Sequence, residues 1–193
     1  MSIAYVHVKR REDFPQHEEM FSFIESYMGY LPNSYLLMAE NPILLNAFSG
    51  LTNAVFASDE IDNQTKQLIA LASSLSSGCK YCQSHTSHGA ERAGVPVEKI
   101  SEILDYENSI HFSEKEKSFL SLAFASGKIP NQANKNHFDS LRKFFNPAQI
   151  TMIVSVISLF GFLNRWNDTF GTEIEKLPGD FVENELIPLG WNK

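Results

Sequence analysis

Three things are scarce in this chain of 193 residues: cysteine, positive charge and long apolar runs. With two cysteines, the chain cannot be a small disulfide-stapled scaffold. Its 16 basic and 23 acidic residues give a formal net charge of -7, which argues against nucleic-acid binding and against adsorption to anionic membranes. The longest apolar run, at residues 150–163, is too short to span a bilayer, and no apolar segment of a secretory signal precedes the first charges. We therefore expect a cytoplasmic protein without nucleic-acid or membrane partners.

The rest of the composition indicates a folded helical domain. Hydrophobic residues make up 43% and charged residues 20% of the chain, as in ordinary soluble globular proteins. Apolar residues recur at helical spacing through most of the sequence, whereas only residues 3–8 alternate as a strand would. We expect one all-α domain over residues 1–193, with an N-terminal arm at residues 1–15 and an irregular C-terminal tail at residues 176–193.

Local start and stop signals delimit several of the expected helices. Asn41 precedes Pro42, an arrangement typical of a helix start, and Ser113 with Glu116 predicts a capping box. Asn146, followed by proline, predicts another start, ahead of the long apolar run. These signals and the apolar spacing predict helices over about residues 16–29, 42–57, 59–76, 79–94, 113–127 and 147–166.

The stretch "SSGCKYCQSHTSH" holds both cysteines. Cys79 and Cys82 are separated by two residues, so on a helix they lie one turn apart on the same side, with His85 and then His88 on the following turns. The unpaired N–H groups and the dipole at a helix N-terminus stabilise a thiolate, and a neighbouring imidazole can take a thiol proton. The segment therefore has the parts for a cycle between dithiol and disulfide.

Other interpretations of this segment are weaker. The pattern C-x2-C-x2-H-x2-H contains four possible zinc ligands, but one continuous helix cannot surround a metal ion tetrahedrally. Haem attachment needs histidine directly after the second cysteine, where this chain has Gln83. We expect no metal and no organic cofactor. The remaining alternative is that both cysteines are inert core residues, since free cysteine is commonly buried.

The residues around the cysteines carry a family resemblance. The stretch "QTKQLIALASSLSSGCKYCQSHTSHGAERAGV" resembles the central motif of the carboxymuconolactone decarboxylase-like superfamily, in particular its alkylhydroperoxidase D-like, peroxidase-related branch. The stretches "GYLPNSYLLMAENPILLNAF" and "VISLFGFLNRWNDTFGTEIE" agree with that branch, so the resemblance covers about residues 27–175. It implies a multi-helix bundle with the two cysteines at the start of a central helix. It also implies assembly into dimers, trimers or hexamers.

The resemblance also implies roles for individual residues. In the family, the second cysteine, here Cys82, attacks the peroxide, and the first, Cys79, resolves it. The family's relay glutamate lies twelve residues before the first cysteine, where this chain has Gln67. The family's relay histidine lies seven residues after the first cysteine, where this chain has Thr86, preceded by His85.

The proton relay of the family is therefore rebuilt or lost in this chain. Our hypothesis is that His85 acts as the base, while another residue supplies the acid. Asp168 and Glu91 are the candidates for that acid, although Asp168 is equally well explained as a helix-end residue. We expect Tyr81 to pack or hydrogen-bond beside the thiols, and His88 to lie at the surface or just behind the reacting groups.

These inferences predict an enzyme that reduces peroxides through Cys79 and Cys82, with an external thiol or lipoyl-type protein as its reductant. Two other functions remain open on the sequence. One is decarboxylation of a lactone acid, the activity for which the superfamily is named and which needs no pair of thiols. The other is a helical redox sensor without catalytic turnover.

Overall fold

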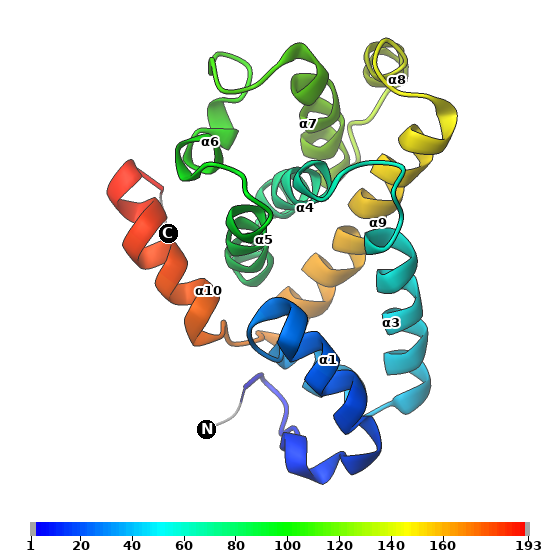
Figure 1. The fold of residues 1–193 in the computed structure, drawn as a ribbon, viewed down its shortest axis with the longest axis vertical. Coiled ribbons are helices and arrows are strands. Elements are labelled where there is room, and N and C mark those ends of the chain that lie inside the picture. The colour runs from blue at the N-terminus through cyan, green and yellow to red at the C-terminus, as the bar shows by residue number, and fades with distance from the viewer. Residues whose placement is uncertain (1–2, 192–193) are drawn as a thin grey trace.

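A computed structural model describes residues 3–191, and these residues form helices and turns without a strand (Figure 1). The expected all-α fold class is confirmed. The helices are α1 (Glu18–Met28), α2 (Asn33–Ala39), α3 (Pro42–Phe56), α4 (Asn63–Ser77), α5 (Lys80–Arg92), α6 (Val97–Ser101), α7 (Glu114–Gly127), α8 (Lys135–Leu141), α9 (Pro147–Phe170) and α10 (Lys176–Phe181).

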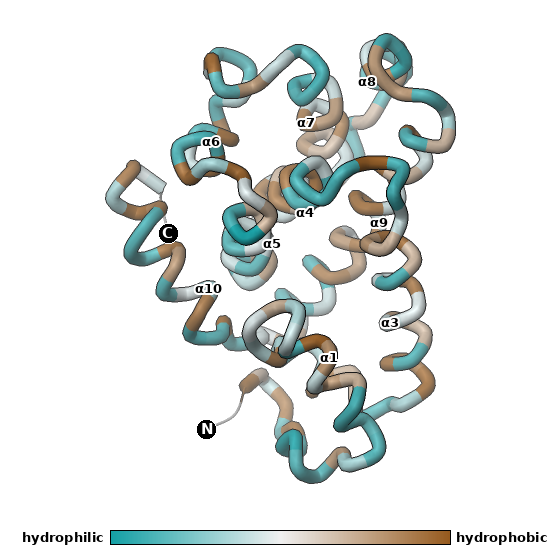
Figure 2. Tube along the Cα trace, viewed as in Figure 1, coloured by the Kyte–Doolittle hydropathy of each residue, from teal (hydrophilic) through white to brown (hydrophobic). Residues whose placement is uncertain are grey.

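Helix α4 lies at the centre of the bundle, where it packs against α5, α7 and α9 (Figure 1). Its N-cap is Asp62, whose carboxylate accepts a hydrogen bond from the backbone of Thr65. Leu68, Ile69 and Leu71 are buried within it. Because apolar residues face outward from α4 on several sides, neighbouring helices can pack around it, and Figure 2 shows it as one of the hydrophobic segments of the chain.

The helix starts that the sequence predicts are confirmed. The Asn41 side chain accepts a hydrogen bond from the backbone N–H of Leu44 at the start of α3. Ser113 and Glu116 form a reciprocal capping box at the start of α7. Asn146 forms the equivalent box with Gln149 ahead of α9. Each cap satisfies backbone N–H groups that the first helical turn leaves without partners.

Helix α9 is longer than the apolar run on which its prediction rests. By length and composition it is a helix that could cross a membrane, alone in this respect among the described residues. It packs against α3, α4, α5 and α7. Its last turns bring two buried amides, Asn164 and Asn167, toward the middle of the molecule.

The C-terminal segment differs from its expectation. We expected an irregular tail, but α10 continues into a π-helical turn (Val182–Leu186) and a 3-10 turn (Ile187–Leu189). A proline in the interior of a helix usually breaks it. Pro178 stands in the first turn of α10, where a missing N–H removes no intrahelical hydrogen bond. The helix packs against α5, so the tail forms part of the bundle.

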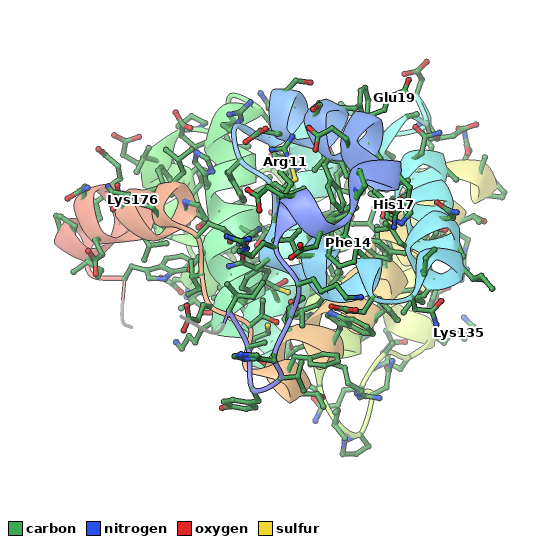
Figure 3. The ribbon with its side chains drawn as sticks, turned by 90° about the horizontal axis from the view of Figure 1, so that it is seen from below. Arg11, Phe14, His17, Glu19, Lys135 and Lys176 are labelled. Atoms are coloured by element: carbon green, nitrogen blue, oxygen red, sulfur yellow. The ribbon has the colours of Figure 1, made fainter. Side chains whose placement is uncertain are left out.

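The N-terminal arm lies against the segment that joins α9 to α10. The backbone N–H of Tyr5 donates to the carbonyl of Phe170 at 2.8 Å, and that of Glu173 donates to the carbonyl of Ile3 at 2.9 Å. The Tyr5 ring covers Gly171, where a Cβ atom would lie 2.4 Å from the ring. After the arm, two 3-10 turns (Arg11–Asp13 and Pro15–His17) lead into α1 (Figure 3).

Candidate active site

The two cysteines lie at the junction of α4 and α5. Gly78 ends α4 in the left-handed conformation, with φ of 83°, and so turns the chain sharply into α5. Cys79 is the N-cap residue of α5, and its sulfur accepts a hydrogen bond from the backbone N–H of Cys82 at 3.5 Å. Both thiols are free, with exposed fractions of 0% for Cys79 and 2% for Cys82. Cys82, unlike Cys79, lines a cavity between the helices.

Burial raises the pKa of the Cys82 thiol well above its usual range, and the neighbouring sulfur of Cys79 adds to this effect. The amide of Asn167, whose Nδ2 lies 3.6 Å from the Cys82 sulfur, acts in the opposite direction. From the sequence we expected a lowered pKa instead, because a helix N-terminus favours a thiolate. Desolvation outweighs the helix dipole at this depth, so the resting form of Cys82 is the thiol.

Both ring nitrogens of His85 have partners. Nδ1 lies 3.1 Å from the hydroxyl of Tyr30, and Nε2 lies 2.5 Å from a carboxylate oxygen of Glu175. The imidazole stacks on the ring of Tyr81, with 4.1 Å between the ring centroids. His85 and Cys82 both line the cavity, but these two nitrogens are not directed at the sulfur. The imidazole instead connects the Tyr30 hydroxyl at the cavity wall with a buried carboxylate.

Glu175 is held on three sides. Besides His85, it accepts a hydrogen bond from the Tyr81 hydroxyl at 2.8 Å and another from the backbone N–H of Asn33. Its side chain is 11% exposed. Donors on three sides fix the carboxylate in place. Glu175 thus occupies the place that we expected an acidic residue from α5 or α9 to fill.

The two acids considered from the sequence lie elsewhere. Asp168 is on the exposed side of α9, outside the cavity lining. Glu91 is exposed on α5 and is also outside the lining. Neither residue is brought to His85.

The remaining residues singled out from the sequence line the cavity. Gln67 projects from α4 onto Gly89, where a Cβ atom would lie 2.6 Å from the amide oxygen. His88 stacks on Tyr30, with ring centroids 6.1 Å apart, and lies close to Phe181. Burial lowers the pKa of His88, so this imidazole is neutral at neutral pH. Within residues 3–191, no three His, Cys, Asp or Glu side chains are grouped to hold a metal ion.

The cavity has a volume of about 470 Å³ and mostly apolar walls. Its apolar side chains come from α1, α3 and α9, and include Phe23, Ile24, Tyr27, Phe48, Phe56, Leu159, Phe160 and Leu163. The polar residues of the wall include Cys82 and Asn167, and also Tyr30, His85 and His88. Such a site suits a small apolar ligand that a few polar groups orient.

Sequence reasoning missed three of these residues: Tyr30, Asn167 and Glu175. Tyr30 and Glu175 lie 55 and 90 positions from His85, so no helical periodicity connects them to it. A partial signal was available, since Tyr30 lies in "GYLPNS" and the other two lie in "NRWNDTFGTEIE", both within the stretches that carry the family resemblance.

Comparison with known proteins agrees with this fold. Residues 42–125, which run from the start of α3 into α7, match the carboxymuconolactone decarboxylase family. The apo structure of the debrominase Bmp8 is 36% identical, covers 91% of this chain and 95% of its own, and superposes with a TM-score of 0.85. A Bmp8 variant with cysteine replaced by alanine, in complex with 2,3,4-tribromopyrrole, is 34% identical with a TM-score of 0.86, covering 95% and 96% of the two chains.

More distant proteins share the fold. A peroxidase-related protein with an alkylhydroperoxidase AhpD core, from Ralstonia eutropha JMP134, is 19% identical and superposes with a TM-score of 0.82 over 92% of this chain and 95% of its own. Protein 4 of the cox locus of Paracoccus denitrificans is 39% identical over 59 residues, which span 31% of this chain and about half, 53%, of that relative. The chain therefore belongs to the carboxymuconolactone decarboxylase-like superfamily, with an alkylhydroperoxidase D-like fold.

Proposed function

We propose that this protein is a thiol-dependent reductive dehalogenase that acts on a small halogenated aromatic ring. The observation that carries the proposal is Cys82, a cysteine with a second thiol beside it, set in the wall of an apolar cavity of about 470 Å³. A ring the size of a pyrrole fits such a space, whereas a small peroxide does not require it. The likeness to Bmp8 along nearly the whole chain supports the same class of substrate.

The reaction balances with the two thiols alone. The Cys82 thiolate attacks the halogen, the electron pair of the carbon–bromine bond stays on the ring carbon, and that carbon takes a proton. Cys79 then displaces bromide from the sulfenyl bromide on Cys82, which forms the disulfide. One carbon–bromine bond and two thiols thus yield one carbon–hydrogen bond, one disulfide and hydrogen bromide.

The proton for the ring carbon comes from Tyr30 in this proposal. Its hydroxyl lies at the cavity wall and is 3.1 Å from His85, which in turn pairs with Glu175. Burial and the charge of Glu175 raise the pKa of Tyr30, so the hydroxyl keeps its proton until the ring carbon demands it. The imidazolium form of His85, which the Glu175 carboxylate stabilises, then passes its Nδ1 proton to the tyrosine oxygen and becomes the neutral imidazole.

Regeneration requires an external dithiol or lipoyl-type reductant, as we expected for a peroxidase of this fold. The exposed fractions of both cysteines are close to zero, and only Cys82 of the pair lines the cavity. We therefore propose that a slender thiol enters the cavity and attacks the Cys82 sulfur, which releases Cys79. A reducing compartment such as the cytoplasm, and a homo-oligomeric enzyme, remain part of this proposal.

Reduction of alkyl hydroperoxides is the second candidate, since the free, adjacent thiol pair serves it equally well. Cys82 would attack the peroxide oxygen, the alkoxide would take its proton, and Cys79 would displace water from the sulfenic acid. The products are one alcohol, one water and one disulfide. The tyrosine hydroxyl at the cavity wall could supply the proton here as well.

The test is bromide release from 2,3,4-tribromopyrrole by the reduced protein with dithiothreitol, beside cumene hydroperoxide consumption under the same conditions. We expect bromide release, incorporation of deuterium from heavy water at the vacated ring carbon, and loss of both signals in Cys82→Ala. Hydroperoxide turnover without bromide release would make the second candidate the function. Turnover of a lactone acid that survives loss of both thiols would indicate a decarboxylase. A change of oligomeric state on oxidation, without turnover of any of these compounds, would indicate a sensor.

A further inference from the structure

We infer that Asn167 is a positioning residue that holds the Cys82 sulfur and stabilises its thiolate by donating an amide N–H to it. The inference deepens the proposed function, because it rests on Cys82 as the attacking sulfur. The sequence directs attention to the neighbouring Asp168, which instead faces outward on α9. The helix turns Asn167 inward, to the cavity wall beside the thiol pair.

The geometry defines the role of this amide. Asn167 Nδ2 lies 3.6 Å from the Cys82 sulfur and 3.0 Å from the carbonyl oxygen of Leu163, one helical turn earlier. The bond to Leu163 uses one N–H and fixes the amide plane, so the second N–H is directed at the sulfur. Among the described residues, no other side chain donates a hydrogen bond to this sulfur.

Packing does not explain why an amide stands at this position. Asn167 is 2% exposed, and its Oδ1 is buried without a hydrogen-bond partner. A buried carbonyl without a partner lowers the stability of the fold, and an apolar side chain of similar shape would avoid that loss. The amide is therefore better explained by what its nitrogen does for Cys82 than by the stability of the α5–α9 contact.

The charges around the sulfur otherwise oppose a thiolate. Cys79 at the N-cap of α5 and Asp168 on α9 both disfavour a negative charge on Cys82, while Asn167 favours it. The other titratable side chains of the cavity wall are Tyr27 from α1, Tyr35 from α2, Tyr81, His85 and His88 from α5, Arg92 at the end of α5, and Tyr30 ahead of α2. The Asn167 amide is the neutral donor that turns toward the sulfur from the facing helix.

The chain offers a matched control one turn away. Asn164 lies on the same side of α9, has the same exposed fraction of 2%, and also carries a buried Oδ1 without a partner. Its Nδ2 is directed at the backbone carbonyl of Ser73, and Asn164 does not line the cavity. Asn164→Leu thus repeats the chemical change of Asn167→Leu without touching the sulfur.

The experiment measures the pH dependence of Cys82 alkylation by iodoacetamide, read by peptide mass spectrometry in a Cys79→Ser background. We expect Asn167→Leu to raise the pKa of Cys82 so that alkylation below pH 8 slows about tenfold, which corresponds to about one pKa unit. Asn164→Leu should leave the profile unchanged, and thermal unfolding should show Asn167→Leu to be at least as stable as the parent. Identical alkylation profiles for the two leucine variants would overturn the inference.

A second variant covers the case in which Asn167→Leu does not fold. Asn167→Asp keeps the shape but replaces the N–H donor by a negative charge, so alkylation should slow by more than tenfold, and parental alkylation in this variant would also overturn the inference. Alkylation needs no substrate, so this readout is independent of the proposed dehalogenation. If the parent released no bromide yet the two asparagine variants separated as expected, the proposed function would fail and the role of Asn167 would stand.

Discussion

Helices α4 and α5 lie side by side at the centre of the bundle, yet they bury opposite kinds of side chain. α4 buries mainly leucine, isoleucine and alanine, with some polar residues at its ends, whereas α5 buries mainly cysteine, glutamine, serine and threonine, together with Tyr81 and Ala90. Figure 2 shows the contrast, with α4 hydrophobic and α5 largely hydrophilic. A polar helix in a buried position contributes little hydrophobic free energy. The comparison teaches that α4 carries the stability of the fold, and that α5 is buried for its chemistry.

The buried polar side chains of α5 find their partners mainly within the helix. Thr86 Oγ1 donates to the carbonyl of Cys82 at 2.6 Å, and Ser87 donates to that of Ser84 at 3.1 Å. These local bonds satisfy the hydroxyls without tying α5 to its neighbours. Hydrogen bonds from outside the helix include those at the site, from Glu175 to His85 and from Asn167 to Cys82, and those that Gln83 and Arg92 make to the backbone of α4 and α1.

The largest effect should come from Cys82→Ala on α5. The attacking sulfur is lost, so bromide release should fall by at least about a thousandfold, while the temperature of unfolding stays within a few degrees of the parent, since one buried thiol of modest size is removed. Parallel turnover and calorimetry check both parts. Unimpaired turnover would show that α5 does not carry the attacking group. The functional contrast between α4 and α5 would then be wrong.

His85→Gln should lower turnover by about a hundredfold or more, the usual contribution of a general acid or base. Glutamine can still hydrogen-bond with Glu175 but cannot carry a proton to Tyr30 at 3.1 Å. Iodoacetamide alkylation of Cys82 serves as the control and should be nearly unchanged. If alkylation fell as far as turnover, His85 would act on the sulfur rather than on the substrate.

On α4, Leu71→Ala should do the opposite of the α5 variants. Leu71 is fully buried, and such a truncation destabilises a protein by about 2–5 kcal/mol. Urea denaturation measures that loss, and turnover per folded molecule should remain close to the parent. A variant of unchanged stability would show that α4 does not carry the core.

The rate of Cys82 alkylation should rise with pH. Because burial raises the pKa of Cys82, the thiolate is the minor form at neutral pH, and its fraction grows about tenfold for each pH unit below that pKa. Initial rates of alkylation should therefore rise steadily between about pH 6.5 and about pH 9.5. This interval includes the ordinary cysteine pKa of ~8.5. A flat profile over this interval would mean that the thiolate already predominates at neutral pH.

The smallest effect should come from Ser87→Ala on α5. The hydroxyl is fully buried but bonds only within its own helix, and alanine is the better helix former. The free energy of unfolding should change by less than about 1 kcal/mol, and turnover should not change. A loss as large as that of Leu71→Ala would contradict the distinction drawn between the two helices.

Local chemistry explains what the sequence could predict. The caps at Asn41, Ser113 and Asn146 depend on residues three positions apart, so their patterns are legible without the fold. The placement of Cys79 and Cys82 at the start of a helix follows from Gly78 in the same way. The prediction of an irregular tail was wrong because the effect of a proline such as Pro178 depends on where its helix begins. The sequence does not mark that position.

The rest of the site depends on the fold as a whole. Glu175 reaches His85 from a loop 90 residues away, and Tyr30 from one 55 residues away, and neither approach leaves a periodic signal. The pKa of Cys82 moves opposite to the expectation because burial, which dominates it, is a property of packed helices rather than of a motif. Asn167 and Asp168 are adjacent in sequence, and only the rotation of α9 decides which of them faces the sulfur.

The N-terminal arm gives the first residues of the chain a share in the chemistry. Ile3 and Tyr5 bond to the backbone on either side of Gly171, just ahead of the loop that brings Glu175 to His85. The arm thus supports the backbone of the loop from which Glu175 reaches His85, while Asn33, Tyr81 and His85 hold the carboxylate itself.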